Sequence, residues 1–175
     1  HVSGARVEVA GAITVGLNGE GMSELGLMSE AGAVAFSDGR KPMENAALLR
    51  RALDYARPFG LPVFLRPGEP DLEGAGVMHE GAVSTQIGLR GIPAAAEEVG
   101  VGRAIALARL TGARVHLTQV TTRTSVEQVK RAREEGLLVT AAAPARHLIL
   151  TDREVDESVY DTSTRLLPPL RSESD

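Results

Sequence analysis

Short apolar, β-rich runs alternate with longer helical patterns along this chain, and this alternation constrains the fold more than any other feature. The runs cover residues 6–14, 33–37, 61–65, 114–120 and 137–143, and the helical patterns cover residues 22–31, 42–58, 93–110 and 126–135. The order βαβαβαβαβ predicts parallel strands joined by right-handed crossovers. The pattern alone allows a closed α/β barrel or an open doubly wound sheet, and five strands are too few for a complete eight-stranded barrel.

Two further stretches lack a clear periodic pattern. Residues 67–91 are rich in Gly, and a loop of that length is generally functional or disordered, so we expect one of these two here. Near the end of the chain, the sequence Thr-Asp-Arg-Glu that begins at Thr151 is typical of a capping box and predicts a short helix. From Asp161 onward we expect an extended, loop-like tail.

The composition excludes several classes of function. The length of 175 residues suits one domain, and the net charge of −4, with acids and bases interspersed, gives no basic face for nucleic acid. No apolar run reaches the roughly 18 residues that a membrane span needs. The absence of Cys excludes disulfides and thiolate metal sites, and it is typical of a cytoplasmic protein.

Three residues stand where an α/β barrel keeps its catalytic groups, at the carboxyl ends of predicted strands. They are Gly39, Arg66 and Gln119. None of them is an ordinary metal ligand, and Arg66 brings a fixed positive charge. This edge of the predicted sheet therefore has the position of an active site without the usual side chains.

Blocks of sequence spread over nearly the whole chain keep a common order and spacing. They are Gly32-Ala-Val-Ala-Phe-Ser-Asp38, Gly76-Val-Met-His-Glu-Gly-Ala-Val-Ser84, Leu89-Arg-Gly-Ile-Pro-Ala-Ala-Ala-Glu-Glu98, Thr111-Gly-Ala-Arg-Val-His116, His147-Leu-Ile-Leu-Thr-Asp152 and Pro168-Pro-Leu-Arg171. Together they resemble dihydroorotases of the longer, multifunctional-type branch of the amidohydrolase superfamily. The resemblance implies an α/β fold of the (β/α)₈ TIM-barrel type. Residues 1–175 would form a single-domain central part of it, about strands three to seven, incomplete at both ends.

The resemblance also implies a reaction and a cofactor. The family opens or closes the cyclic amide of dihydroorotate at a zinc site of His and Asp ligands, where the metal polarises the amide carbonyl and supplies hydroxide. Matched to this pattern, the bridging carboxylate is replaced by Gly39, and two ligand imidazoles are replaced by Arg66 and Gln119. The family's His-x-His and its final Asp would lie before His1 and after Asp175.

Other landmarks of the family are also altered. In the segment that matches Thr-Ala-Glu-x-x-Pro-His-His, Ala142 replaces the Glu and Arg146 replaces the first His, whereas His147 is retained. Leu167 replaces the substrate-binding Asn before Pro-Pro-Leu-Arg. We therefore expect no catalytic residue and no metal ligand here, only a degenerate site region. It comprises Asp38, Glu69, Ala142, Arg146, His147 and Leu167.

This degenerate pattern is similar to the pseudo-dihydroorotase that some bacteria keep as a non-catalytic companion of aspartate transcarbamoylase. The similarity implies a scaffold in pyrimidine biosynthesis whose partner is the catalytic subunit of that transcarbamoylase. A homo-oligomer is also expected, because a half barrel exposes sheet edges and an apolar inner face. The alternative is an active zinc-dependent dihydroorotase, or a related cyclic amidohydrolase, with an altered metal site. A third possibility is a fragment that does nothing alone.

Charged side chains near the predicted strand ends have simpler explanations than catalysis. We expect Arg66 to pair with Asp38 or Glu69, so that an ion pair replaces the charge of the lost metal. Paired carboxylates at Asp38 and Glu69 could otherwise do acid–base chemistry. Asp71 and Glu73 are expected to form a solvated loop face.

The imidazoles and hydroxyls are expected to be structural. We expect His79 to face solvent, although a partner contact there is possible, and we expect His116 and His147 to be packed or hydrogen-bonded. The hydroxyl-rich stretch before the helical pattern 126–135 could bind an anion. Helix capping by Thr124 or Ser125 explains it without a ligand. The stretch comprises Thr121, Thr122, Thr124 and Ser125.

Overall fold

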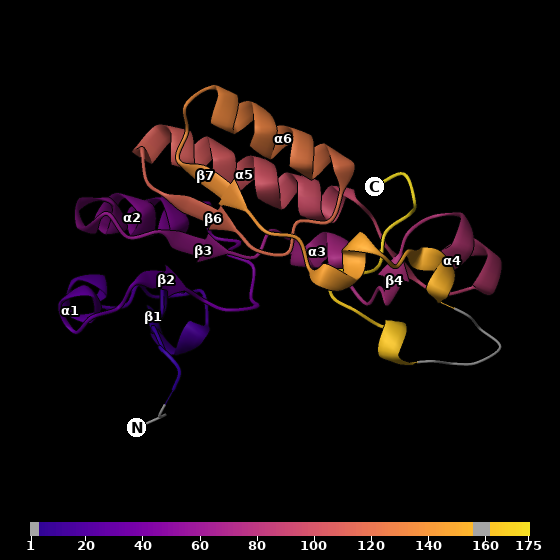
Figure 1. The fold of residues 1–175 in the computed structure, drawn as a ribbon, viewed down its shortest axis with the longest axis horizontal. Coiled ribbons are helices and arrows are strands. Elements are labelled where there is room, and N and C mark those ends of the chain that lie inside the picture. The colour runs from indigo at the N-terminus through magenta and orange to yellow at the C-terminus, as the bar shows by residue number, and fades with distance from the viewer. Residues whose placement is uncertain (1–3, 156–161) are drawn as a thin grey trace.

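The computed structural model describes residues 4–155 and 162–175. Its main sheet has five strands in the order β1-β2-β3-β6-β7, and every neighbouring pair is parallel (Figure 1). The strands are β1 Ala10–Gly11, β2 Ala35–Ser37, β3 Val63–Leu65, β6 Val115–Leu117 and β7 Val139–Ala141. The predicted parallel α/β order is therefore confirmed.

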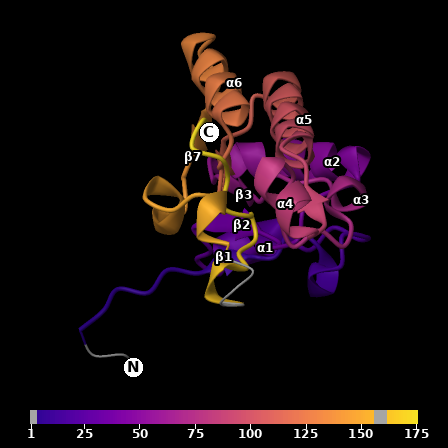
Figure 2. The same ribbon diagram turned by 90° about the vertical axis from the view of Figure 1, so that its right-hand side faces the viewer.

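Four helices in the described part of the chain cover one face of the sheet. They are α1 Leu25–Glu30, α2 Ala46–Ala56, α5 Ala95–Thr111 and α6 Arg123–Glu134. Helix α5 packs between α2 and α6, as Figures 1 and 2 show. Single 3₁₀ turns occur at η1 Val15–Leu17, η2 Arg57–Phe59, η3 Ala145–Leu148, η4 Asp152–Glu154 and η5 Thr162–Thr164.

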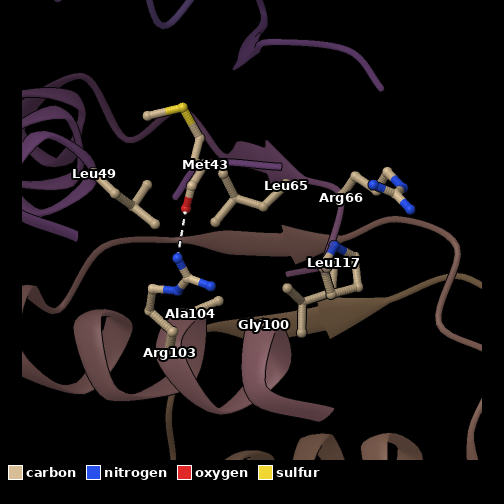
Figure 3. A pocket seen from close by; sticks show the side chains of 10 residues that line it. Met43, Leu49, Leu65, Arg66, Gly100, Arg103, Ala104 and Leu117 are labelled. Atoms are coloured by element: carbon tan, nitrogen blue, oxygen red, sulfur yellow. Dashed lines mark hydrogen bonds between the residues drawn. The ribbon is translucent and has the colours of Figure 1, made fainter. Parts of the chain in front are cut away.

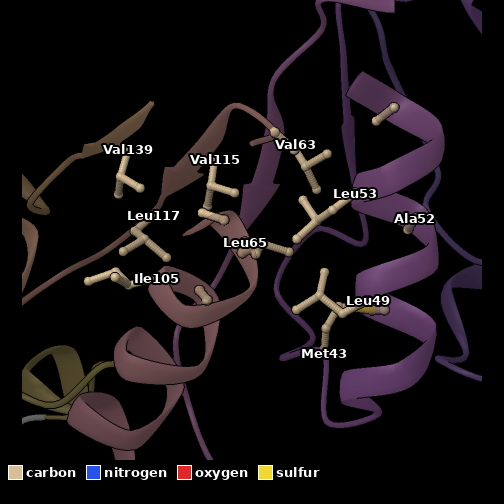
Figure 4. Close-up of a cluster of buried hydrophobic side chains, with 14 of the residues drawn as sticks. Met43, Leu49, Ala52, Leu53, Val63, Leu65, Ile105, Val115, Leu117 and Val139 are labelled. Atoms are coloured by element: carbon tan, nitrogen blue, oxygen red, sulfur yellow. The ribbon is translucent and has the colours of Figure 1, made fainter. Parts of the chain in front are cut away.

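The core lies between the sheet and these helices. Alternate strand residues point toward the helices, because successive side chains of a strand face opposite sides of the sheet. Figure 4 shows these strand side chains meeting Leu49 and Leu53 of α2 and Ile105 of α5. The strand members of this layer are Val63, Leu65, Val115, Leu117 and Val139, all of them buried. The apolar stripe predicted within residues 42–58 is thus the buried face of α2.

The opposite face of the sheet carries a row of side chains in register. Ser37 pairs with Phe64, Phe64 with His116, and His116 with Thr140. The first three are half-buried and Thr140 is exposed. In a closed α/β barrel this face is the interior of the barrel.

The strand predicted over residues 6–14 is mostly absent, because only Ala10–Gly11 pair with β2. Strand β1 lies at the edge of the sheet, and Val7 and Val9 are 69% and 63% exposed. Only the end of this run joins the core, where Ile13 is fully buried, whereas the beginning of the run is exposed.

The prediction of one long loop over residues 67–91 is wrong. The segment contains α3 Pro70–Glu73, β4 Met78–His79 and α4 Ala82–Ile87, and β4 pairs with β5 Gly91–Ile92 in a separate two-stranded sheet. These elements are too short for a periodic pattern to detect. They form a lobe at the end of the molecule opposite α1, where the C-terminal segment also lies (Figure 1).

The predicted helix start at Thr151 is confirmed, although it begins only a single turn. The Thr151 side chain accepts a hydrogen bond from the Arg153 backbone N–H, and the turn Asp152–Glu154 follows. Asp161, where the extended tail was predicted to begin, lies outside the described residues, and the described part begins with the turn Thr162–Thr164. No helix among the described residues is long and apolar enough to span a membrane.

Candidate functional site

The three residues singled out at predicted strand ends follow three neighbouring strands of the sheet. Arg66 comes directly after β3, and Gly39 and Gln119 are the second residues after β2 and β6. These strands are adjacent and parallel, so all three residues lie along the carboxyl edge of the sheet. Gly39 and Gln119 both adopt left-handed backbone conformations, with φ of 66° and 59°. Gly adopts this conformation freely, whereas it is uncommon for Gln.

Arg66 forms a buried ion pair, but not with a predicted partner. Its Nη2 donates to Oε1 of Glu73 at 2.6 Å, and the two side chains are only 4% and 15% exposed. The expectation that a carboxylate neutralises Arg66 is therefore confirmed, and the expected partners Asp38 and Glu69 are wrong. Glu73 was also expected to be solvated, which is wrong, whereas Asp71 is exposed as predicted.

The two expected partners of Arg66 are engaged elsewhere. The buried Asp38 carboxylate accepts from the backbone N–H of Thr14 at 2.9 Å and from its hydroxyl at 2.5 Å. Glu69 forms an ion pair with Arg103 of α5. Neither arrangement leaves a pair of free carboxylates, so the alternative of acid–base chemistry by Asp38 and Glu69 has no geometric support.

Arg103 ties the loop after β2 to the loop after β3. Its Nη1 donates to the backbone carbonyl of Met43 at 3.1 Å (Figure 3) and to that of Glu44 at 2.8 Å. Its Nη2 forms the ion pair with Glu69. Desolvation by burial lowers the pKa of Arg103, and the nearby Glu44 opposes this change. The cavity between these loops and α5 has a volume of about 10 Å³, room for about one water molecule and not for a substrate.

A larger hollow lies beside Asp38. It has a volume of about 430 Å³ and is bordered by polar and charged residues of the loops around the end of β2, including Asn18, Lys41 and Asn45. Asn45 caps α2, since its side chain accepts from the Leu48 backbone N–H at 3.0 Å. Through Asp38 and Lys41, this hollow borders the loop that follows β2.

The residues at the carboxyl edge do not fit a zinc ion. Gly39 has no side-chain donor, Arg66 is a cation held by Glu73, and the Gln119 amide is a poor zinc ligand compared with imidazole or carboxylate. Among residues 4–155 and 162–175, no group of three His, Cys, Asp or Glu side chains is arranged to hold a metal. We therefore derive no catalytic step through a metal at this edge.

The other landmark residues follow β7, and of these Ala142 lies at the carboxyl edge, because its backbone is hydrogen-bonded to Leu117 and to Val120 beside Gln119. Ala142 and Arg146 are exposed, and Arg146 donates to the Ser163 carbonyl at 3.3 Å. Leu167 is 52% exposed. The Nε2 of His147 lies 3.1 Å from the carbonyl oxygens of both Pro168 and Pro169, an arrangement that fits the structural role expected for His147.

The other two imidazoles among the described residues have different environments. His116 lies on the open face of the sheet, with its Nδ1 2.8 Å from the Thr140 hydroxyl and its ring 4.9 Å from that of Phe64. Desolvation by burial lowers its pKa. The prediction that His79 faces solvent is wrong, because His79 is buried and its Nδ1 lies 3.2 Å from Nη1 of Arg171.

Sequence reasoning missed a buried polar cluster around Arg171. The side chains of Arg171 and Glu97 are 4% and 3% exposed and lie 3.4 Å apart. Glu97 also accepts hydrogen bonds from the backbone N–H groups of Thr121 and Thr122. The helical period places Glu97 on the same stripe as Val101, so the period could have revealed a buried carboxylate there.

The hydroxyl-rich stretch does cap a helix, but through a different residue. Thr122 is the N-cap of α6, and its hydroxyl accepts from the Ser125 backbone N–H at 3.2 Å. The prediction that Thr124 or Ser125 caps this helix is therefore wrong. The helix begins at Arg123, three residues earlier than predicted.

The sequence of residues 2–125 matches the family model described as "Dihydro-orotase-like". The chain belongs to the dihydroorotase-like family. Proteins named dihydroorotase from Anaeromyxobacter sp. (strain K) and Pelotomaculum thermopropionicum are 48% and 52% identical to it, over 98% and 94% of this chain. The aligned parts are 40% and 38% of those relatives, so the chain spans less than half the length of these family members.

Solved structures support the fold expected for the family. A D-hydantoinase structure matches 87% of this chain with a TM-score of 0.71 and 24% identity, covering 35% of the hydantoinase chain. An L-hydantoinase (dihydropyrimidinase) from Arthrobacter aurescens matches 95% of this chain with a TM-score of 0.71 and 20% identity, covering 38% of that protein. The parallel sheet and its helices thus correspond to part of the TIM-type barrel of these proteins.

Proposed function

We propose that this chain is part of a non-catalytic dihydroorotase-like subunit that serves as a scaffold for aspartate transcarbamoylase in pyrimidine biosynthesis. The observation that carries this proposal is the buried ion pair between Arg66 and Glu73. It puts a permanent cation at a position matched to a zinc-binding imidazole, where a metal dication would be repelled.

The neighbouring positions support the same conclusion. Gly39 and Gln119 stand at the other two matched positions, and neither supplies a carboxylate or an imidazole. The absence of a ligand at one matched position could reflect a rearranged metal site. Its absence at all three matched positions leaves this edge of the sheet without the expected metal ligands. What the subunit keeps is a packed α/β framework whose outer surface is available for a partner.

The competing proposal is an active dihydroorotase with an altered metal site. Its support is the identity of 48% and 52% to proteins that are named dihydroorotase. Such an enzyme would need ligands from parts of the barrel outside this chain, together with a metal position displaced from Arg66.

Metal content and turnover separate the two proposals. The full-length protein, purified in buffer containing zinc, should contain far less than one zinc per chain and should neither hydrolyse dihydroorotate nor cyclise carbamoyl aspartate. Stoichiometric zinc together with turnover would establish the enzyme instead.

The scaffold part needs its own experiment. The full-length protein mixed with the catalytic subunit of aspartate transcarbamoylase from the same organism should sediment as one complex in analytical ultracentrifugation. Bovine serum albumin in place of the transcarbamoylase is the control. Two independent sedimenting species would contradict the scaffold role. They would not bear on the proposed lack of catalysis, which the zinc and turnover measurements test separately.

A further inference from the structure

A buried carboxylate fixes the turn that follows β6. Glu97 lies in the first turn of α5, and its Oε1 accepts from the backbone N–H groups of Thr121 and Thr122 at 2.8 and 2.9 Å. The Thr121 hydroxyl donates to the other carboxylate oxygen. A carboxylate with several donors in a buried site is strongly localised, because moving it would leave those donors without a partner.

Arg171 completes this site from the C-terminal segment. Its Nη2 lies 3.4 Å from Glu97, and its Nε donates to the Thr121 hydroxyl oxygen at 3.0 Å. Its Nη1 lies 3.2 Å from Nδ1 of His79 and 3.5 Å from the carbonyl oxygen of Ile92. The guanidinium therefore supplies the charge that a buried Glu97 requires and connects the turn to the β4–β5 lobe.

The turn held in this way contains Gln119. On one side of it, the Thr118 N–H donates to the Leu65 carbonyl at 2.9 Å, and on the other the Val120 N–H donates to the Ala142 carbonyl at 2.9 Å. Gln119, between these anchors, has a φ of 59°. A left-handed residue other than Gly persists only where surrounding contacts enforce the conformation.

We propose that Glu97 and Arg171 are positioning residues that hold the turn 119–122 and thereby keep Gln119 left-handed at the carboxyl edge of the sheet. The inference rests on the proposed function only in treating position 119 as a former ligand position. It adds that the backbone conformation at position 119 is retained, although the side chain at this position has changed from an imidazole to an amide.

The hydrogen bonds of Glu97 go to Thr121, Thr122 and Arg171 and not to Gln119, so energetic coupling between Glu97 and Gln119 tests the proposal. Gln119→Gly removes the cost of a left-handed non-Gly residue, and it should increase the folding equilibrium constant of the full-length protein by roughly threefold to tenfold. In a Glu97→Gln background the turn is no longer held, and the same Gln119→Gly change should have no effect. Glu98→Gln, at the next position of the same helix and partly exposed, is the matched control and should leave the effect of Gln119→Gly intact.

Amide hydrogen exchange supplies a local readout that a general loss of stability would not reproduce. In Glu97→Gln, the amides of Thr121 and Thr122 should exchange roughly tenfold faster, while those of Leu49 and Leu53 in α2 should not change. If Glu97→Gln fails to fold, Thr121→Val tests the same site more gently, and Thr121→Ser, which keeps the hydroxyl, should restore slow exchange.

Two outcomes would overturn the positioning role. One is an equal effect of Gln119→Gly in the wild-type and Glu97→Gln backgrounds. The other is unchanged exchange at Thr121 and Thr122 when Glu97 or the Thr121 hydroxyl is removed. Neither measurement uses zinc or turnover, so the failure of this inference is distinguishable from the failure of the proposed function.

Discussion

The guanidinium of Arg66 and the carboxylate of Glu73 meet at 2.6 Å inside the loop that follows β3, and both side chains are largely buried. The pair joins the end of the strand to the end of α3, and between its partners Glu69 forms an ion pair with Arg103 of α5. A buried pair of this kind makes each partner depend on the other, because removing one leaves an uncompensated charge.

Replacing Arg66 should therefore destabilise the protein strongly. We expect Arg66→Met to lower the free energy of unfolding by about 3 kcal/mol, since it leaves Glu73 buried without its partner. Arg50→Met is the matched control, because Arg50 pairs with Asp54 on an exposed helix face and its loss should change stability by less than about 0.5 kcal/mol. Urea denaturation of both variants measures the difference, and equal effects would contradict a stabilising buried pair.

Two glycines of α5 should respond to alanine with opposite signs. A Cβ added at Gly100 would lie 2.3 Å from the backbone nitrogen of Gly68, so Gly100→Ala should push the loop after β3 away and cost about 1–2 kcal/mol. At Gly102 the nearest atom is Oε1 of Gln128 at 3.5 Å. Gly102→Ala should therefore stabilise the helix by about 0.5–1 kcal/mol. Thermal unfolding distinguishes the two, and stabilisation by both would show that the loop yields freely.

Stability should fall as the pH drops below the ordinary titration range of His. Desolvation by burial and then the charge of Arg171 lower the pKa of His79, while Asp175, Asp152 and Glu80 act in the opposite direction. Because the folded state binds this proton less readily than the unfolded chain, the stabilising contribution is complete above pH 6.5 and is lost as the pH falls toward the lowered pKa.

The size of this effect is bounded and its origin can be isolated. One His contributes at most about 1.4 kcal/mol per pH unit within the window. The variant His79→Asn keeps an acceptor for Arg171 but does not titrate, so urea denaturation between pH 7.5 and 5.5 should show a shallower decline. An identical decline in this variant would assign the pH dependence to other groups, such as His116, whose pKa burial also lowers.

Zinc should not stabilise the full-length protein. A ligand that binds only the folded state at 100 times its Kd adds about 2.7 kcal/mol to the free energy of unfolding, which a melting curve detects readily. We expect the same melting temperature with zinc, with EDTA and with calcium as the control cation. A rise with zinc alone would indicate a metal site that the carboxyl edge around Arg66 does not provide.

Much of the fold was predictable because long elements bury regular stripes. The apolar residues of α2 recur at the helical period, and the strands β2, β3, β6 and β7 are apolar runs between such helices. Elements of two to six residues are too short for a helix or strand period to be recognised in the sequence. The β4–β5 lobe was missed for this reason. The strand predicted at residues 6–14 is too long because an alternating pattern does not reveal how much of a run lies beside a neighbouring strand. Here only Ala10–Gly11 pair with β2.

The shared edge of the three singled-out residues was predictable, but their contacts were not. Strand order fixes which residues follow neighbouring strands, and the structure places Gly39, Arg66 and Gln119 along one edge of the sheet. The choice of Glu73 over Asp38 as the partner of Arg66 depends on the path of the intervening loop, which no local pattern specifies. The pairing of Glu97 with Arg171 likewise joins segments 74 residues apart.

The Arg66–Glu73 pair also constrains how position 66 can change during evolution. A mutation from Arg to His at position 66 leaves the Glu73 carboxylate without its partner in a largely buried site. Such a mutation is disfavoured by folding itself, and it becomes neutral only if Glu73 has changed beforehand. The order of substitutions therefore matters, because a change at either residue of the pair depends on an earlier change at the other.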